Sequence, residues 1–308
     1  MIVALAGGVG AARFLEGLVK VVPPESVTVV VNTGDDAEFY GLHVSPDIDI
    51  VVYTLAGIVN SAQGWGIAGD TFNTLEMLGR LGRETWFQLG DRDLATLIHR
   101  TDLLHRGLSL SEATAQIATA LGVRVRILPM SDSAVRTTVR TPDGWLPFQE
   151  YFVKQRTEPE VLEIAYTGAD AALPAPRVLE SIASADTVIL CPSNPLVSIG
   201  TTLAVPGMRD ALRETRATIV AVSPIVGGGT IKGPADRMMR GLGMEVSPVG
   251  VARAYEDFLD ALVLDEQDAA YAAEIEALGI RARVTDTIMR DIIAKERLAR
   301  ETVSAAIS

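Results

Sequence analysis

The first loop that could do chemistry follows the short apolar run Ile2–Ala6 and reads Gly7-Gly8-Val9-Gly10. Glycines allow the backbone to approach a phosphate closely, and the free amides at the start of a following helix donate hydrogen bonds to it. Arg13 stands where the dinucleotide fingerprint has its third glycine or alanine, and the lysine of a Walker loop is absent. We predict that Gly7, Gly8 and Gly10 bind a phosphate group, with a tight structural turn as the alternative.

A second polar loop, Asn32-Thr33-Gly34-Asp35-Asp36, follows the apolar run Val27–Val31. In a dinucleotide-binding fold, a single acidic residue at this point would bind a ribose. Two adjacent carboxylates suit Mg²⁺ better, because this ion takes oxygen ligands and shares them with substrate phosphates. We predict that Asp35 and Asp36 bind Mg²⁺ and that Asn32 contacts the nucleotide; a solvated acidic turn is the alternative.

The segment Ser45-Pro46-Asp47-Ile48-Asp49 has the pattern of a helix start. Proline is favoured at the first helical position, and serine is favoured at the N-cap before it. Asp47 is then explained by its favourable interaction with the helix dipole. Asp49 lies two residues further on, where neither capping nor the dipole requires an acid, so it is a candidate functional residue.

The segment Gln88–Asp93 predicts a strand that ends in Gly-Asp, with Asp91 as the cap of the next helix. Arg92 would then lie in the first helical turn, where a positive charge interacts unfavourably with the dipole. A phosphate or carboxylate partner would explain this arginine. Arg92 is therefore a candidate substrate ligand.

Two further loops follow apolar runs in the second half of the chain, and both are rich in Ser, Asn, Pro and Gly. They are Pro192–Pro195 and Ser223–Gly229. Their hydroxyls, amides and bare backbone suit a nucleotide, and ligands bind at the carboxyl ends of strands in open α/β sheets. The residues assigned to nucleotide or phosphate binding are Ser193, Asn194, Pro224 and Gly227. Cys191, directly before the Pro192–Pro195 loop, is expected to be a small buried hydrophobe.

Composition excludes several classes of protein. Hydrophobic residues make up 48% of the 308 residues and charged residues 21%, so the chain can bury a core and is not wholly disordered. The net charge of -12 argues against a general affinity for nucleic acid or an anionic membrane. A single cysteine permits neither an intramolecular disulfide nor a thiolate zinc cluster. The start does not resemble a signal peptide and no apolar run has membrane-spanning length, so the expected location is the cytoplasm.

Short apolar runs alternate with helical patterns at both ends of the chain. The runs are Ile2–Ala6, Val27–Val31, Val188–Cys191 and Ile219–Val222, and they indicate buried parallel strands. Helices are predicted at Ala11–Val22, Asp91–Arg106, Arg177–Ser184 and Met208–Thr215. The apolar stripe of the second helix consists of Leu94, Leu97, Ile98 and Leu104. This alternation predicts an α/β fold with a Rossmann-like, mostly parallel sheet and helices on both faces.

The middle and the tail of the chain have different patterns. Thr137–Arg140 and Trp145–Phe152 flank the turn sequence Pro142-Asp143-Gly144 and predict a hairpin. We expect a small antiparallel or helical extension at about residues 130–172, within a single domain of residues 1–308. The tail, Asp286–Ile307, predicts an amphipathic helix packed on the sheet surface, with a partner-binding helix as the alternative. Its expected apolar residues are Ile288, Ile292 and Ile293.

No Ser-His-Asp set or catalytic cysteine context stands out, so the residues indicate a nucleotide- or phosphate-binding α/β enzyme assisted by Mg²⁺. Taken together, the motifs resemble the CofD/FbiA family, the transferases that assemble the deazaflavin coenzyme F420. The segments that carry the resemblance are GGVGAARFLEGL, VVVNTGDD, SPDIDIVVYTLAG, WGIAGDTF, LGDRDLATLIHR, ILPMSD, FQEYFV, PSNPLVSIG, PGMRDAL and VSPIVGG. They run in unbroken order from about residue 2 to about residue 265, and their ordered combination is highly specific.

The resemblance implies a reaction. A guanosine-diphospho donor, lactyl-2-diphospho-5'-guanosine or its enolpyruvyl counterpart, gives its acyl-bearing phosphate to the terminal ribityl hydroxyl of the deazaflavin Fo, and GMP leaves. The family requires Mg²⁺, has a Rossmann-like core and is typically dimeric, which implies a homodimer here. The matching motifs place Asp49 at Fo, as a base or as a tether, and make Gln88 a second Fo contact at a position that is often basic elsewhere. Arg92, in the same segment as Gln88, is assigned to the Fo site as well.

The resemblance leaves the donor open among lactyl, enolpyruvyl and glyceryl compounds. Val9 replaces the threonine of the archaeal type, and together with Arg13 it resembles the actinobacterial members, which favour the phosphoenolpyruvyl donor. One alternative function is a non-enzymatic, nucleotide-sugar-binding regulator of the gluconeogenesis-factor type, which shares the glycine opening. Another is an NAD-dependent oxidoreductase, against which the glycine spacing and the doubled Asp35-Asp36 argue.

Overall fold

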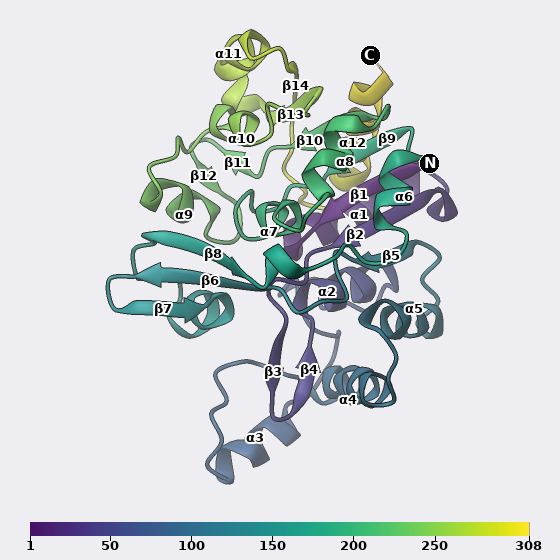
Figure 1. The fold of residues 1–308 in the computed structure, drawn as a ribbon, viewed down its shortest axis with the longest axis vertical. Coiled ribbons are helices and arrows are strands. Elements are labelled where there is room, and N and C mark those ends of the chain that lie inside the picture. Colours follow the sequence, from purple (N-terminus) through teal and green to yellow (C-terminus); the bar gives the residue numbers. More distant parts are fainter. Residues whose placement is uncertain (308) are drawn as a thin grey trace.

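The structure, a computed structural model, describes residues 1–307 and is organised around a seven-stranded sheet (Figure 1). Its strands are β1 (Ile2–Ala6), β2 (Val27–Val31), β5 (Arg126–Pro129), β9 (Thr187–Leu190), β10 (Thr218–Val222), β13 (Ala261–Asp265) and β14 (Arg281–Thr285). The strand order is β14-β13-β10-β9-β1-β2-β5, and every pairing is parallel. The predicted α/β fold is confirmed.

Both faces of this sheet are buried, which is why its central strands lack polar alternation. In β1, Val3 and Leu5 belong to one hydrophobic cluster, whereas Ala4 and Ala6 belong to the cluster on the opposite face. The first face is covered by α6 (Val178–Ala183), α7 (Ile199–Leu203), α8 (Met208–Glu214), α10 (Pro248–Ala254) and α11 (Ala272–Ala277). The second is covered by α1 (Gly8–Val21), α2 (Pro46–Leu55), α5 (Leu110–Ala120) and α12 (Ile292–Ile307). Helices therefore cover both faces, as predicted.

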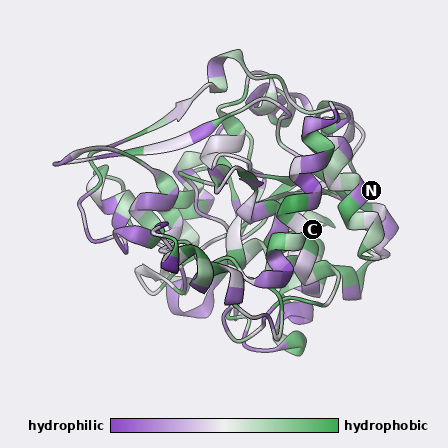
Figure 2. Ribbon diagram, turned by 90° about the horizontal axis from the view of Figure 1, so that it is seen from below, coloured by the Kyte–Doolittle hydropathy of each residue, from purple (hydrophilic) through white to green (hydrophobic). Residues whose placement is uncertain are grey.

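The predicted extension is a three-stranded antiparallel sheet that projects from the body as an arm (Figures 1 and 2). It consists of β7 (Gly144–Pro147), β6 (Arg136–Thr141) and β8 (Glu163–Thr167). The prediction of a strand as far as Phe152 is wrong, because Glu150–Lys154 forms a π-helical turn, η2. Phe148 and Phe152 stack with ring centroids 5.5 Å apart, a contact between positions i and i+4 that a helical turn provides and a strand does not.

Two smaller units frame the sheet. The hairpin of β3 (Ala37–Phe39) and β4 (Leu42–Val44) lies beside α3 (Asn73–Arg80) and α4 (Asp91–His105), which Figure 1 shows below the sheet. The hairpin of β11 (Ile225–Val226) and β12 (Gly229–Thr230) precedes α9 (Ala235–Gly241). Short 3-10 turns complete the chain: η1 (Pro24–Ser26), η3 (Ala169–Ala171) and η4 (Glu266–Tyr271).

The tail helix differs from its prediction in start and in buried face. Helix α12 begins at Ile292 rather than Asp286, because Thr287 donates hydrogen bonds from its backbone amide and its hydroxyl to Asp265 Oδ2, at 2.8 and 2.9 Å. Ile293 is 74% exposed, so the isoleucines do not form the contact face. The buried residues are instead Ala294, Leu298, Ala299, Thr302 and Ala305. These mostly small side chains allow α12 to pack closely against α1.

Cys191 directly follows β9 and is buried, as expected of a small hydrophobe. Burial raises the pKa of its thiol, which is therefore protonated at neutral pH. Among residues 1–307, no helix combines the length and the apolar character needed to cross a membrane.

Candidate active site

The loops at the carboxyl ends of the strands enclose a cavity of about 660 Å³. It is the crevice in which ligands bind to open α/β sheets. The predicted site residues that line it are Gly7, Gly8, Gly10, Asp35, Asp49, Gln88, Ser193, Asn194 and Pro224. Four predicted site residues do not line it: Asn32, Asp36, Arg92 and Gly227.

The three glycines of the first loop have different structural roles. A Cβ atom at Gly7 would lie 2.6 Å from Ser198 Cβ, and one at Gly10 would lie 2.2 Å from the Pro192 carbonyl oxygen, so both positions need glycine for close packing. Gly8 has a φ of +72° and no atom within 4 Å of a built Cβ. Helix α1 begins at this residue rather than at Ala11. The open space at Gly8, at a helix start, can admit a ligand phosphate.

The loop after β9 holds the glycine loop in place. Ser193 Oγ accepts from the amide of Gly7 at 3.3 Å and donates to the Gly7 carbonyl at 3.0 Å. Asn194 Oδ1 accepts from the amides of Leu196 at 2.9 Å and Val197 at 3.3 Å. Gly227, in the β11–β12 turn, donates its amide to Asp268 and does not line the cavity.

Asp47 is a cavity residue rather than a partner of the helix dipole alone. Its Oδ1 accepts from the Gly8 amide at 2.8 Å, and its Oδ2 accepts from Asn32 Nδ2 at 2.9 Å. Asn32 is therefore placed behind the cavity wall, where it orients Asp47. Pro46 is the first residue of α2 as predicted, but the expected side-chain cap is absent, because the Ser45 hydroxyl bonds to Asp36 instead.

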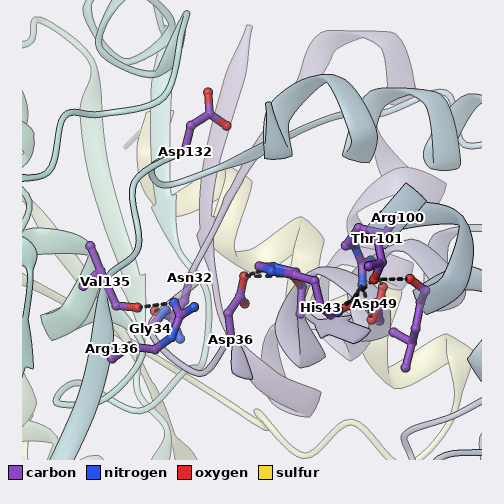
Figure 3. A network of polar contacts seen from close by, with 12 residues as sticks. Asn32, Gly34, Asp36, His43, Asp49, Arg100, Thr101, Asp132, Val135 and Arg136 are labelled. Carbon is purple, nitrogen blue, oxygen red and sulfur yellow. Dashed lines mark hydrogen bonds and ion pairs between the residues drawn. The ribbon is translucent and has the colours of Figure 1, made fainter. Parts of the chain in front are cut away.

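The adjacent acids Asp35 and Asp36 point in different directions. Asp36 Oδ2 accepts from Ser45 Oγ at 2.8 Å and lies 3.0 Å from His43 Nε2, as Figure 3 shows for the histidine. Its Oδ1 is buried and has no hydrogen-bond partner among residues 1–307, but Asp36 does not line the cavity. Asp35 does line the cavity, and its Oδ1 is buried and unpartnered as well.

Asp35 and Asp47 are buried acids of the cavity, and both have raised pKa values. Burial, and then the negative charges of Asp47 and Asp36, raise the pKa of Asp35 well above its usual range. Burial also raises the pKa of Asp47 to about 6, against the lowering effect of its bonds from Asn32 and Gly8. An unpartnered carboxylate oxygen beside a second buried carboxylate fits a divalent cation, whose charge favours both ionised forms. Among residues 1–307, no three acidic, His or Cys side chains form a complete metal site, so such an ion needs ligands from water or substrate.

Asp49 lies further along α2 and is compensated by a buried arginine that the sequence analysis missed. Arg100 Nη1 donates to Asp49 Oδ2 at 3.0 Å, and Arg100 Nη2 donates to Asp49 Oδ1. Arg100 is 0% exposed, and Figure 3 shows it pointing from α4 toward α2. Its position on the predicted apolar stripe, three residues after Leu97, is the signal that could have found it. The stripe itself is partly wrong, since Ile98 is exposed.

Asp93 is a second acid on the wall next to Asp49. Its Oδ1 accepts from the hydroxyl of Tyr53 at 2.7 Å. Burial and the charge of Asp49 raise the pKa of Asp93 to about 7, while Tyr53 and Arg100 act in the opposite direction. A carboxyl group that titrates near neutral pH in a cavity is typical of an active site.

The segment before α4 is not a strand, which corrects that prediction. Gln88 lines the cavity and donates to the Thr85 carbonyl at 2.9 Å. Arg92 lies outside it, and its Nη1 donates to the Ala68 carbonyl at 3.1 Å. Asp91 does not cap α4 but accepts from the Thr74 amide at the start of α3, whereas Asp70 accepts from the Arg92 amide at the start of α4. Asp91, the first residue of α4, therefore caps α3, and Asp70, which precedes α3, caps α4. Sequence spacing alone does not reveal this exchange.

Among the basic side chains that line the cavity, Arg13 and Lys232 lie close to each other near Gly64. A Cβ atom at Gly64 would lie 3.2 Å from Lys232 Nζ and 3.8 Å from Arg13 Nη2, so both cations approach the same glycine. Burial and then the charge of Arg13 lower the pKa of Lys232. Lys232 Nζ donates to the Gln63 carbonyl at 3.1 Å, and within residues 1–307 neither cation has an acidic partner. This pair favours an anionic ligand.

Comparison with known proteins decides the family. A family model described as "2-phospho-L-lactate transferase CofD" matches residues 2–304. The chain belongs to the CofD family. The phosphoenolpyruvate transferase of Streptomyces griseus is 46% identical over 311 residues, which cover 99% of this chain and 98% of that protein. The 2-phospho-L-lactate transferase of Methanosarcina acetivorans is 43% identical over 295 residues, covering 96% and 95% of the two chains.

Membership of the CofD family confirms the resemblance found in the sequence, and with it a transferase of coenzyme F420 biosynthesis. The fold has a relative among solved structures. A UPF0052-family protein from Bacillus halodurans has a TM-score of 0.68 to this chain at 16% identity, over 98% of both chains. At this identity the likeness concerns the fold alone. The two differently named relatives are similarly close, so they leave the donor open.

Proposed function

We propose that this CofD-family protein transfers a phospholactyl or phosphoenolpyruvyl group from a guanosine-diphospho donor to the ribityl hydroxyl of Fo. GMP is the leaving group. The observation that carries this proposal is that one cavity joins a glycine loop, two unpaired cations and a buried pair of acids to a second pair of acids. Phosphoryl transfer needs little more from a protein than positioning and charge neutralisation.

The donor end of the cavity is defined by Gly8, Arg13, Asp35, Asp47 and Lys232. The open backbone at Gly8 leaves room for a phosphate, and Arg13 with Lys232 supplies positive charge to the diphosphate and the donor's carboxylate. Asp35 and Asp47 would hold Mg²⁺ on the cavity side, with Asp36 behind them rather than beside the ligand. When bound, Mg²⁺ neutralises charge that develops on the transferred phosphate.

The acceptor end is defined by Asp49, Tyr53, Gln88 and Asp93. Of the two roles expected for Asp49, the ion pair with Arg100 favours the tether, because both carboxylate oxygens already accept hydrogen bonds. Gln88 can offer its amide to the polar edge of the deazaflavin. Arg92 bonds to the Ala68 carbonyl outside the cavity, which favours a structural role over Fo binding. The homodimer and the cytoplasmic location stay predictions.

The reaction can be tested directly. The purified protein is mixed with Fo, Mg²⁺ and one of the lactyl, enolpyruvyl and glyceryl donors, and the products are identified by mass spectrometry. We expect stoichiometric GMP and the matching Fo phosphodiester, and competition among donors identifies the preferred three-carbon group. The same mixture with a chelator in place of Mg²⁺ is the control. Absence of GMP release with all three donors would refute the proposed function.

A further inference from the structure

The acceptor end contains two carboxyl groups, and their hydrogen bonding differs in a way that separates their roles. Both oxygens of Asp49 accept from Arg100. Asp93 Oδ1 accepts from the Tyr53 hydroxyl at 2.7 Å, but Asp93 Oδ2 accepts no hydrogen bond from residues 1–307 and is not sealed from solvent. Because Asp93 lines the cavity, this free oxygen is available to a ligand.

We propose that Asp93 is the general base of the transfer, an assignment that rests on the proposed function. The hydroxyl oxygen of the acceptor attacks the acyl-bearing phosphorus of the donor and forms a new P–O bond. The bond from that phosphorus to the bridging oxygen breaks, and GMP leaves with the electron pair. The hydroxyl proton moves to Asp93 Oδ2 and is later released to water. No oxidant or further reactant is needed.

The groups that surround Asp93 fit this task. Asp49 and Tyr53 approach it from α2, Arg100 lies on its own helix, and Asp70 belongs to the loop before α3. Burial, Asp49 and Asp70 raise the pKa of Asp93, Tyr53 and Arg100 lower it, and the result is about 7. A general base is most effective when its pKa lies near the working pH, because it is then both ionised and basic.

Asp49 is then a positioning residue. Its charge is balanced by Arg100, which is completely buried, and taking up a proton would weaken that pair. The negative charge of Asp49 instead keeps Asp93 basic. This arrangement of two neighbouring acids with different environments is how one site separates a proton acceptor from a group held in an ion pair.

Asp93→Asn tests the assignment, because it keeps the shape of the side chain and removes its basicity. We expect kcat to fall by roughly 10²–10⁴-fold while the affinity for Fo, measured by calorimetry, changes less than about threefold. In the wild-type protein kcat should fall below about pH 7, and this acid limb should be absent from the variant. Asp102→Asn, an exposed acid on the same helix, is the matched control and should keep full activity.

Tyr53→Phe provides a second test that does not depend on the stability of the first variant. It removes the hydrogen bond that favours ionised Asp93, so the acid limb should move to higher pH. An Asp93→Asn protein with normal kcat and weaker Fo binding would overturn the assignment, as would an acid limb that persists at the same pH in Asp93→Asn. These results require active wild-type protein; if the wild type itself forms no product, the proposed function fails and the assignment with it.

Discussion

The donor and acceptor ends of the cavity both carry paired aspartates, but the pairs are balanced differently. At the acceptor end, Asp49 is neutralised by Arg100 within the protein. At the donor end, no basic side chain among residues 1–307 pairs with Asp35 or Asp47, and burial together with neighbouring negative charge raises the pKa of both acids. Within the described part of the chain, Arg13 and Lys232 at the donor end form no ion pair with an acid either.

This difference indicates where the ligands supply charge. A buried ion pair that is complete in the protein fixes a surface for a largely neutral acceptor, and it needs nothing from outside. At the donor end, by contrast, the carboxylates and the cationic side chains are not paired with each other. A ligand that carries both a cation and anionic phosphates can neutralise both kinds of charge. A magnesium-bound diphosphate has this combination.

The largest effect on stability is expected from breaking the ion pair at the acceptor end. Arg100→Met leaves Asp49 as an uncompensated buried charge and should lower the free energy of unfolding by about 3–5 kcal/mol in urea titrations. The double variant with Asp49→Asn should recover most of that loss. Arg140→Met, which breaks an exposed pair with Glu163, is the control and should cost less than about 1 kcal/mol. If Arg100→Met also lowered the free energy of unfolding by less than about 1 kcal/mol, the buried pair Arg100–Asp49 would be no stronger than the exposed pair Arg140–Glu163.

At the donor end, the largest expected effect is on turnover. Replacing Asp35 and Asp47 together by Asn removes the proposed Mg²⁺ ligands and should lower kcat at least about 10²-fold. The Mg²⁺ concentration for half-maximal activity should rise in each single variant, whereas Asp102→Asn should leave it unchanged. An unaltered Mg²⁺ dependence in both single variants would contradict the binding of Mg²⁺ by Asp35 and Asp47.

The two cations should affect one substrate and not the other. Arg13→Ala or Lys232→Ala should raise the donor KM by roughly 10–100-fold, the loss expected for a charged hydrogen bond. The Fo KM should remain within about twofold of wild type. Lys20→Ala, in the last turn of α1, should change neither constant. Equal effects on both substrates would argue against separate donor and acceptor ends.

The smallest effect is a pH-dependent gain in stability. Because the native pKa of Asp47 is raised from 3.8 to about 6, the folded state binds the proton more tightly than the unfolded chain. The associated stability is fully present below about pH 4 and is lost as the pH rises through about 6. In metal-free buffer, Asp47→Asn should therefore raise Tm by about 2–6 °C at pH 8 and by almost nothing at pH 4. A pH-independent change in Tm would contradict the raised pKa.

The sheet and the loops at the ends of its strands could largely be predicted from the sequence, because these loops are rich in Gly, Ser, Asn and Pro. The turns at Gly7–Gly10, Pro192–Pro195 and Ser223–Gly229 follow runs of Val and Ile, and parallel strands bring such turns to one edge. Strands β5, β13 and β14 were not predicted. Strands β5 and β14 each carry arginine and lie at an edge of the sheet, which weakens their apolar signal. Strand β13 is fully buried, and its short apolar run was overlooked.

The chemistry of the individual acids could not be predicted in the same way. Whether Asp36 or Asp47 faces the cavity depends on how the β3–β4 hairpin folds back, because this brings His43 and Ser45 into contact with Asp36. The contrast between Asp49 and Asp93 depends on Arg100 and Tyr53, whose side chains come from two packed helices. Such contacts are set by tertiary packing, and sequence spacing records only that Arg100 occupies an otherwise apolar stripe.

The two-ended cavity is tested most directly by a crystal structure of the protein with GDP, Mg²⁺ and Fo. We predict the diphosphate against Gly8, Arg13 and Lys232, with Mg²⁺ between it and the carboxylates of Asp35 and Asp47. Fo should lie between Gln88 and Asp49, with its terminal ribityl hydroxyl within hydrogen-bond reach of Asp93 Oδ2. Fo at the glycine loop, or a diphosphate bound away from Asp35 and Asp47, would contradict the division of the cavity into donor and acceptor ends.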